Sequence, residues 1–183
     1  LRPLRAEDWR ALVAAASDPL IWEQHPEPDR YKEDVFRIFF AAALESGGAL
    51  VALDVKSGEI VGSSRFHGYD EARSEVEIGW SFLARSHWGG PCNGEMKRLM
   101  LEHAFQFVQN VVFLTGPRNL RSRRAIEKVG GALVGSGFER GHECLFYRIS
   151  RQSWPLLSPE PACSGLAALV AGNPRSCRSD ESR

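Results

Sequence analysis

A glycine-rich segment with the sequence ARSHWGGPCNGEMK, Ala84 to Lys97, offers backbone chemistry that suits an anion. It follows a strand-like run from Val76 to Leu83 and leads into a helical run from Gly94 to Val108. Backbone N–H groups at a helix N-terminus have no partners within the helix, and the helix dipole adds partial positive charge there. Glycine lets such a backbone approach a phosphate closely. The segment therefore predicts a phosphate-bearing ligand held by main-chain groups.

The spacing of the glycines excludes two common nucleotide signatures. The chain contains neither the G-x-G-x-x-G dinucleotide fingerprint nor the G-x-x-x-x-G-K-[ST] phosphate loop. Taken alone, a glycine turn before a helix is also typical of a plain surface turn. A second segment is needed to decide between an anion site and such a turn.

That second segment, Asn119 to Gly131, reads NLRSRRAIEKVGG and follows the short apolar run Val111 to Leu114. It resembles the N-x-x-S…E-K-x-G-[FG] signature of the GNAT acyltransferase superfamily. The glycine segment then resembles the acyl-CoA pyrophosphate loop W-G-x-G-x-A of the RimJ/RimL-like branch, and Glu77 to Trp80 (EIGW) resembles the fourth strand of that branch. Three matched blocks in the right order, within residues 1 to 155, are more specific than any one of them.

The resemblance implies the GNAT fold, an α/β (α+β) domain with a mixed, mostly antiparallel sheet flanked by helices. In this fold the central parallel strands splay apart and acyl-CoA enters the opening, which 76–83 and 111–115 would line. We expect the domain to cover residues 1–155. Residues 156–183, which contain five Ser and three Pro, are expected to form a disordered or weakly helical tail without a counterpart in the family.

Periodicity and turn residues predict the other elements. The buried side of the second helix is expected to carry Val35, Ile38, Phe39 and Ala42. The expected strands are Leu1 to Arg5 (cut short at its front), Ala49 to Val55, Ile60 to Tyr69, Ala132 to Gly135 and Glu143 to Ser150, and the expected helices are Ala6 to Ser17, Tyr31 to Glu45 and Leu120 to Val129.

The resemblance also assigns residues to the cofactor, acetyl-CoA as co-substrate. Pro91 and Asn93 depart from the family pattern, which has Gly and then Ala or Gly at these positions. Because proline lacks an N–H, we predict one donor fewer, and replacing Pro91 with Gly should tighten binding by ~1 kcal/mol. The residues expected to bind the cofactor are Phe82, Leu83, Trp88, Gly89, Gly90, Cys92, Asn93, Gly94, Asn119 and Ser122.

The segment from Arg118 to Lys128 holds five basic residues and one acid, which suits either the cofactor phosphates or a solvated helix face. Asn119 also fits a simple helix N-cap before Leu120. Both functions are compatible at one residue.

Transfer to an amine requires a group that removes the ammonium proton. Strand alternation puts Glu77 and Glu75 on one face, and we rank Glu77 first and Glu75 second as the base; the alternative is that both are ordinary solvent-facing strand residues. Many family members have a tyrosine where this chain has Ile126. Ser122 and Tyr147 remain as candidate proton donors, with Ser122 better supported by the motif.

Composition bounds the partners. Lys and Arg balance Asp and Glu at 23 each, which argues against a nucleic-acid partner. No apolar run has membrane-spanning length, so no membrane partner is expected. The four cysteines lack C-x-x-C spacing, so we expect no metal site, free thiols and a reducing, cytoplasmic location.

We therefore expect an N-acetyltransferase, a monomer or homodimer, that moves an acetyl group directly to a primary amine. The acceptor would be a protein N-terminus or a small-molecule amine such as an amino-acid-like compound, aminoglycoside or polyamine. A degenerate domain that binds acyl-CoA, or acts only as an interaction module, is the alternative. The acceptor site should lie near the first two helices, where the sequence does not rank Trp22, Glu23, Glu27, Arg30 and Tyr31.

Overall fold

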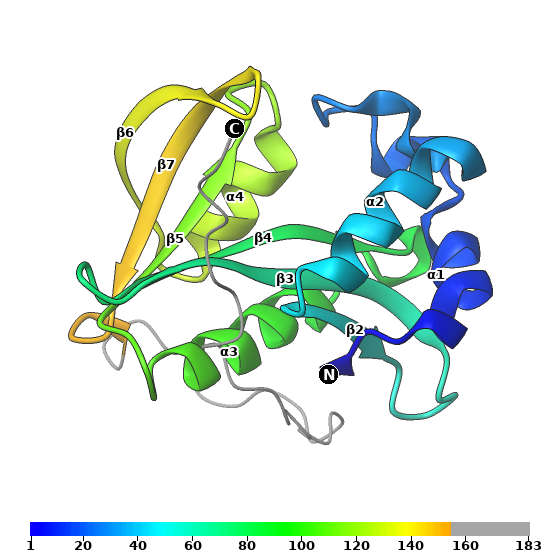
Figure 1. The fold of residues 1–183 in the computed structure, drawn as a ribbon, viewed down its shortest axis with the longest axis horizontal. Coiled ribbons are helices and arrows are strands. Elements are labelled where there is room, and N and C mark those ends of the chain that lie inside the picture. The colour runs from blue at the N-terminus through cyan, green and yellow to red at the C-terminus, as the bar shows by residue number, and fades with distance from the viewer. Residues whose placement is uncertain (155–183) are drawn as a thin grey trace.

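The computed structural model describes residues 1–154, so the tail expected at 156–183 lies outside the described residues. Within this range seven strands form one sheet in the order β1-β2-β3-β4-β5-β7-β6. Only the β4–β5 pair is parallel among these neighbours. Helices flank this sheet (Figure 1), which confirms the predicted mixed, mostly antiparallel architecture.

The elements follow the predicted order along the chain. The strands are β1 (Arg2–Pro3), β2 (Ala49–Leu53), β3 (Ile60–Asp70), β4 (Glu75–Leu83), β5 (Asn110–Thr115), β6 (Ala132–Glu139) and β7 (His142–Ser150). The helices are α1 (Trp9–Ala16), α2 (Glu33–Glu45), α3 (Cys92–Ala104) and α4 (Leu120–Lys128), with short 3-10 turns at Ala6–Asp8, Pro19–Ile21, Pro28–Tyr31 and Arg85–His87.

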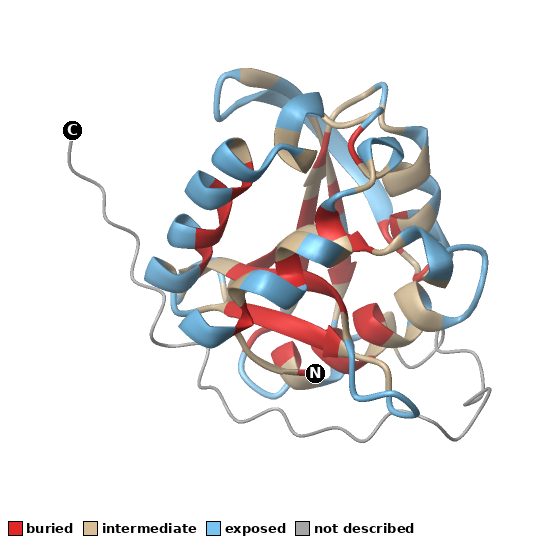
Figure 2. Ribbon diagram, turned by 90° about the vertical axis from the view of Figure 1, so that its right-hand side faces the viewer, coloured by how far each residue is buried: buried red, intermediate tan, exposed pale blue. Residues whose placement is uncertain are grey.

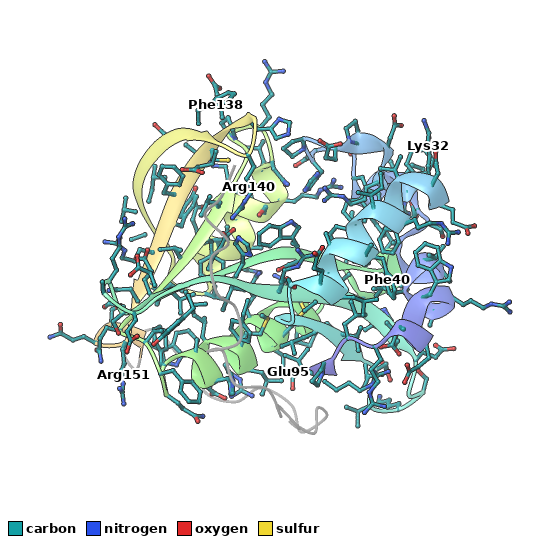
Figure 3. All side chains as sticks on the ribbon, viewed as in Figure 1. Lys32, Phe40, Glu95, Phe138, Arg140 and Arg151 are labelled. Atoms are coloured by element: carbon teal, nitrogen blue, oxygen red, sulfur yellow. The ribbon has the colours of Figure 1, made fainter. Side chains whose placement is uncertain are left out.

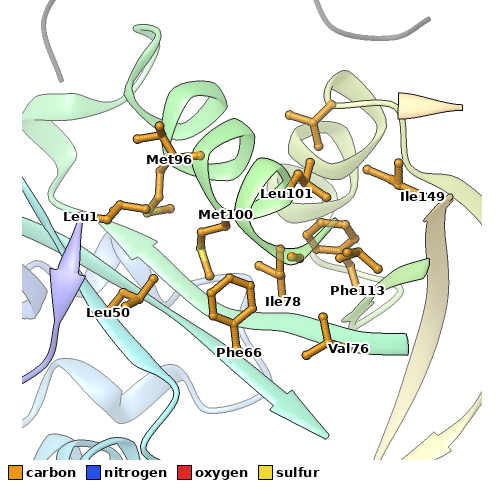
Figure 4. Close-up of a cluster of buried hydrophobic side chains, with 14 of the residues drawn as sticks. Leu1, Leu50, Phe66, Val76, Ile78, Met96, Met100, Leu101, Phe113 and Ile149 are labelled. Atoms are coloured by element: carbon orange, nitrogen blue, oxygen red, sulfur yellow. The ribbon is translucent and has the colours of Figure 1, made fainter. Parts of the chain in front are cut away.

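Two hydrophobic clusters lie on opposite faces of the sheet. The larger one packs α3 and α4 against the strands, with Met96 of α3 beside Leu1 and Leu101 of α3 near Ile78 of β4 (Figure 4). The smaller one is largely aromatic and packs α1 and α2 on the other face. Figure 2 shows that the helices carry their buried residues on the side facing the interior and their exposed residues on the outer side.

Two sequence predictions about helices were wrong in detail. The buried side of α2 consists of Phe36, Phe39, Phe40 and Ala43, and Ile38 is 74% exposed. Phenylalanine rings bury more apolar area than valine or isoleucine, so the helix is rotated to bury them. Helix α3 begins at Cys92 rather than Gly94 and ends at Ala104 rather than Val108. Pro91 accounts for the early start, since its fixed φ suits the first turn of a helix.

The parallel strands β4 and β5 diverge, as the family resemblance implies. Within the described chain they pair only at Glu75 with Asn110, Val76 with Val111, and Glu77 with Val112. Beyond these pairs β4 continues to Leu83, but it is hydrogen-bonded to β3 alone.

An irregularity in β4 lies where the divergence begins. Between the pairs Arg65–Gly79 and Ser63–Phe82, β4 has one residue more than β3, and Trp80 has a φ of 50°. Such a bulge shifts the alternation of side chains by one residue. Val76 and Ile78 therefore join the α3 cluster together with Leu83, whereas Phe82 joins the α1–α2 cluster.

Candidate active site

The segment Trp88–Gly94, called the helix-start loop below, presents uncommitted main-chain donors. Within residues 1–154, the amides of Cys92, Asn93 and Gly94 donate to no protein group, and no side chain caps the helix. A Cβ built at Gly89, Gly90 or Gly94 meets no atom within 4 Å, and Gly89 has a φ of 73°. The loop therefore offers an open set of N–H groups at the positive end of the α3 dipole.

Pro91 fits the start of α3. Its φ of −76° and ψ of −15° are helical, and its carbonyl accepts a hydrogen bond of 2.9 Å from the Glu95 amide. The sequence predicted that proline would remove one donor from the loop. The structure adds that the proline begins the helix without distorting it and leaves three first-turn amides for an anion.

Trp88 and Arg121 connect this loop to two other segments. The Trp88 indole Nε1 donates to the Leu83 carbonyl at 2.9 Å, and the Arg121 guanidinium lies 4.7 Å from the Trp88 ring centroid. Arg121 also pairs with Glu23 at 3.7 Å, and its amide donates to the Gln24 side chain at 3.2 Å. The start of α4 thus contacts both the helix-start loop and the segment before α2.

The start of α4 carries the second sequence motif. The Asn119 side chain accepts a hydrogen bond of 3.1 Å from the Ser122 amide, which confirms that Asn119 caps the helix. Ser122 is half-buried, and within the described chain its hydroxyl has no protein partner. Both residues follow β5 directly, on the side toward which β4 and β5 diverge.

Phe82 and Leu83, which were expected to bind the cofactor, have side chains that are buried in the protein core. Their side chains are buried in the two hydrophobic clusters, with exposures of 6% and 5%. The side chains are therefore committed to the core. Any contact of these residues with a ligand would come from the main chain of β4.

Glu77 and Glu75 are not ordinary solvent-facing strand residues. The Glu77 side chain is 8% exposed and forms a two-pronged ion pair with Arg140, in which Nη1 lies 3.1 Å from Oε1 and Nη2 contacts Oε2. Arg140 reaches from the β6–β7 turn toward β4 (Figure 3). The Glu75 side chain is 13% exposed and pairs with Arg148 of β7 at 3.1 Å. Each candidate base thus depends on an arginine of the β6–β7 hairpin.

Arginine and aromatic side chains alternate beside Glu77. The Arg140 and Arg65 guanidinium groups lie 4.4 and 4.7 Å from the Trp80 ring centroid. Arg65, which is 5% exposed, also lies 5.7 Å from the Phe39 ring. This guanidinium–aromatic stack consists of Arg140, Trp80, Arg65, Phe39, Arg30 and Trp22.

The stack ends at Arg30, one of the five residues that the sequence left unranked. Its guanidinium lies 4.8 Å from the Phe39 centroid and 5.3 Å from the Trp22 centroid. Glu23 instead pairs with Arg121, and Glu27 lies 3.5 Å from His142. The structure therefore places Trp22 and Arg30 inside the stack, while the two glutamates pair with residues outside it.

Lys97 is a site residue that the sequence analysis did not identify. Its ammonium donates to the Ser81 hydroxyl at 2.6 Å and lies 5.1 Å from the Phe113 ring centroid. Ser81 belongs to β4 and Phe113 to β5, so the charge lies at the point where these strands part. Burial lowers the pKa of Lys97 from 10.5 to about 8. The available signal was that Lys97 lies outside the polar stripe of this helical run, which consists of Glu95, Arg98, Glu102 and Gln106.

Tyr147, the other candidate proton donor, is committed elsewhere. It is 1% exposed, its hydroxyl donates to Glu127 at 3.0 Å, and it accepts from Arg123 Nε at 3.2 Å.

Cys92 and Cys144 are free thiols. Among residues 1–154, no three side chains of the kinds that bind metals lie together, and none of the helices has the length and hydrophobicity of a membrane span.

Comparisons with known proteins extend this picture. A family model described as "Acetyltransferase (GNAT) domain" matches residues 1–132. No curated protein matches the sequence. An N-acetyltransferase from Brucella melitensis related to GCN5 is similar in structure, with a TM-score of 0.72 and 22% identity over 85% of this chain and 76% of that chain.

Two further structures were solved with ligands. RimJ from Mycobacterium smegmatis, in complex with CoA-disulfide, has a TM-score of 0.62 and 21% identity over 84% of this chain and 82% of that one. Spermidine N-acetyltransferase from Vibrio cholerae, in complex with CoA and spermine, has a TM-score of 0.66 and 14% identity over 84% of this chain and 96% of that one. At these identities the likeness concerns the fold alone.

Proposed function

The chain belongs to the GNAT acetyltransferase family, and on that premise we propose that it is an acetyl-CoA-dependent N-acetyltransferase of the RimJ/RimL-like branch acting on a primary amine. One observation carries the proposal. The strands β4 and β5 part after Glu77 and Val112, between an uncapped helix start on one side and a buried carboxylate on the other. The family match and the buried carboxylate of Glu77 at this point favour an enzyme over a degenerate domain, whereas the uncommitted amides are expected of either one.

The residues of the helix-start loop fit the cofactor. Its pyrophosphate would be held by the amides of Cys92, Asn93 and Gly94, with Gly89 and Gly90 allowing close approach. Asn119 and Ser122 at the start of α4, and the main chain of β4, would hold the pantetheine arm. When bound, acetyl-CoA supplies an acetyl thioester that a neutral amine attacks directly, without a covalent enzyme intermediate.

We assign Glu77 as the group that takes the ammonium proton of the acceptor, directly or through one water. A carboxylate has about four lone-pair sites, and Arg140 occupies only two of them. The remaining sites can accept from an amine, while Arg140 fixes the orientation of the carboxylate. Glu75 is the second candidate. Ser122, whose hydroxyl is uncommitted in the described chain, is assigned as the proton donor to the leaving group.

A thiol-release assay tests the proposal. The chain, acetyl-CoA and an amine panel are combined, and free thiol is measured at a pH where each amine is partly neutral. We expect release that depends on both the enzyme and an amine, together with a raised melting temperature in acetyl-CoA alone. No thermal shift at millimolar acetyl-CoA would contradict the cofactor assignment, and a shift without amine-dependent release would favour the non-catalytic alternative.

A further inference from the structure

We propose that the buried ammonium of Lys97 stabilises the CoA thiolate as it leaves the acetyl group. The inference rests on the proposed function and adds to it the charge that acts on the leaving sulfur. Three features of the described chain carry it. They are a buried charge without an acidic partner, an N–H group without an acceptor, and a position between the diverging strands.

The first feature is the burial of an uncompensated charge. Lys97 is 4% exposed, and within residues 1–154 no carboxylate lies within ion-pair distance of its ammonium. The side chains that contact it from β4 and β5, Ser81 and Phe113, are uncharged, and so is Ser64 of β3 behind them. Burial alone lowers the pKa of Lys97 from 10.5 to about 8, so the ammonium is mostly protonated at pH 7. A buried cation costs stability, and an anion that forms beside it in the working complex explains why the chain carries one.

The second feature is a donor without an acceptor. An ammonium has three N–H groups. One donates to the Ser81 hydroxyl at 2.6 Å, and a second can face the Phe113 ring, whose centroid lies 5.1 Å away. The Ser81 hydroxyl lies 2.7 Å from that of Ser64, which donates to the Gly79 carbonyl at 3.3 Å, so this chain of hydrogen bonds orients the ammonium and ends on a neutral group. At least one N–H of Lys97 therefore has no acceptor in the described chain.

The third feature is location. The strands β4 and β5 last pair at Glu77 and Val112, and Phe113 is the next residue of β5. Ser81 follows the bulge, in the part of β4 that no longer pairs with β5. Because its ammonium contacts Ser81 and Phe113, Lys97 borders the gap between the strands from the side of α3. With its pyrophosphate at the helix-start loop and the acceptor amine at Glu77, acetyl-CoA would extend down this gap and bring its sulfur between the two strands.

Contact between Lys97 and the sulfur is not required for the effect. In partly buried surroundings, a unit charge about 8 Å from a thiol lowers its pKa by about 1 to 2 units from the usual value of about 8.5. A sulfur between the two strands would lie within about this distance of the ammonium, because neighbouring strands are only about 5 Å apart where they pair. When the C–N bond forms and the C–S bond breaks, the sulfur leaves with the electron pair. The charge of Lys97 stabilises this thiolate until Ser122 or solvent supplies a proton.

The test measures the ionisation of the CoA thiol in its complex with the full chain. Thiolate absorbance in the ultraviolet is followed against pH for the CoA complex. The same titration of the acetyl-CoA complex, which lacks that thiol, is subtracted to remove the contribution of the protein's own cysteines. We expect the pKa of the bound thiol to lie at least about one unit below that of free CoA. A bound thiol with a pKa at or above that of free CoA would overturn the inference.

Variants assign the shift to the charge. Lys97→Met should return the pKa of the bound thiol to its free value or above and lower kcat about tenfold, with KM for acetyl-CoA within about threefold. The matched control is Arg98→Met, which removes the neighbouring charge of α3, an arginine that pairs with Glu102. It should change neither the thiol pKa nor kcat. Lys97→Arg, which keeps a positive charge at this position, should retain part of the shift. An equal thiol pKa in Lys97→Met and the unaltered protein would overturn the inference.

The pH dependence of the rate gives a second readout. The value of kcat/KM for acetyl-CoA, corrected to the neutral amine, reports the ionisation of the free enzyme. It should fall above about pH 8 as Lys97 loses its proton, and this fall should be absent in Lys97→Met. A fall of the same size in both proteins would count against Lys97. The inference and the proposed function fail separately: a lowered thiol pKa without amine-dependent thiol release refutes only the proposed function, whereas release with an unshifted thiol pKa refutes only the inference.

Discussion

The helix-start loop and the guanidinium–aromatic stack are two ends of one candidate site, and they differ in the groups that they offer to a ligand. In the loop, main-chain amides of consecutive residues are the donors. Gly89, Gly90 and Gly94 have no side chain that could block the approach to these amides. In the stack, side chains from α2, β3, β4 and the β6–β7 hairpin come together. The loop depends on local backbone geometry, whereas the stack depends on the whole sheet.

This contrast explains how the two ends can change. A loop that binds through N–H groups tolerates new side chains at positions where they leave the ligand's approach to the amides open, and this loop already carries side chains at Cys92 and Asn93. A stack held by side chains changes its selectivity with each substitution. The loop therefore suits a ligand common to a family, and the stack suits a partner specific to one member.

The largest effect is expected for Glu77→Gln, which changes the carboxylate beside the stack. The change keeps the shape of the side chain and removes the base, so the rate should fall roughly 10²-fold or more. The loss should shrink at high pH, where more amine is already neutral. Acetyl-CoA affinity, measured by calorimetry, should be retained because the helix-start loop is untouched.

Glu75→Gln is the matched control for this prediction. It also removes a largely buried carboxylate that pairs with an arginine, in this case Arg148. Glu75, however, lies before the point where the strands part. We expect only a few-fold loss of rate. A Glu77→Gln enzyme whose pH–rate profile equals that of the unaltered protein would remove Glu77 from the mechanism and make Glu75 or bulk water the proton acceptor.

The next effect concerns the buried charge at the point where β4 and β5 part. Lys97→Met should raise the free energy of unfolding at pH 7 by about 2 kcal/mol, because the folded protein then buries no ammonium. The pKa of Lys97 is about 8 in the fold and 10.5 in the unfolded chain, so the unfolded chain binds more protons between these values. The stability contributed at this position therefore rises with pH across that window.

Denaturant unfolding of both proteins at pH 7 and pH 10 measures this. The advantage of Lys97→Met should shrink toward zero at the higher pH, and groups that titrate in both proteins cancel in the comparison. An advantage that is the same at both pH values would mean that packing, and not the charge, sets the difference.

The helix-start loop and the stack also differ in how well the sequence predicts them. The helix-start loop, the Asn119 cap and the order of elements along the chain could be predicted because glycine, proline, capping residues and side-chain periodicity act within a few positions. The mixed sheet was predicted only through the family resemblance. The stack could not, because Arg65 and Arg140 lie 75 positions apart and meet only through the sheet register. The bulge at Trp80 also reverses the side-chain alternation, which a simple strand pattern cannot show.

A smaller effect would test the loop as a backbone site. Gly94→Ala in the first turn of α3 should raise the stability of the free protein by ~0.5–1 kcal/mol, since alanine is the better helix former and the position is open. Acetyl-CoA affinity should fall about tenfold because the added methyl group stands where the phosphate approaches. Asn93→Ala, which keeps the amide, should leave affinity nearly unchanged. A loss in Asn93→Ala as large as in Gly94→Ala would show that side chains, not amides, hold the ligand.

The smallest effect is expected for Pro91→Gly, where the structure revises the gain of ~1 kcal/mol that the sequence predicts. Glycine restores one N–H, but it also removes a residue whose φ of −76° already suits the helix start. The added freedom of glycine costs roughly 0.5–1 kcal/mol, which nearly offsets the recovered hydrogen bond. Acetyl-CoA affinity by calorimetry should therefore change less than about threefold, with a small loss of thermal stability. Tightening of tenfold would show that the missing donor limits binding, and weakening of tenfold would show that the proline itself shapes the loop.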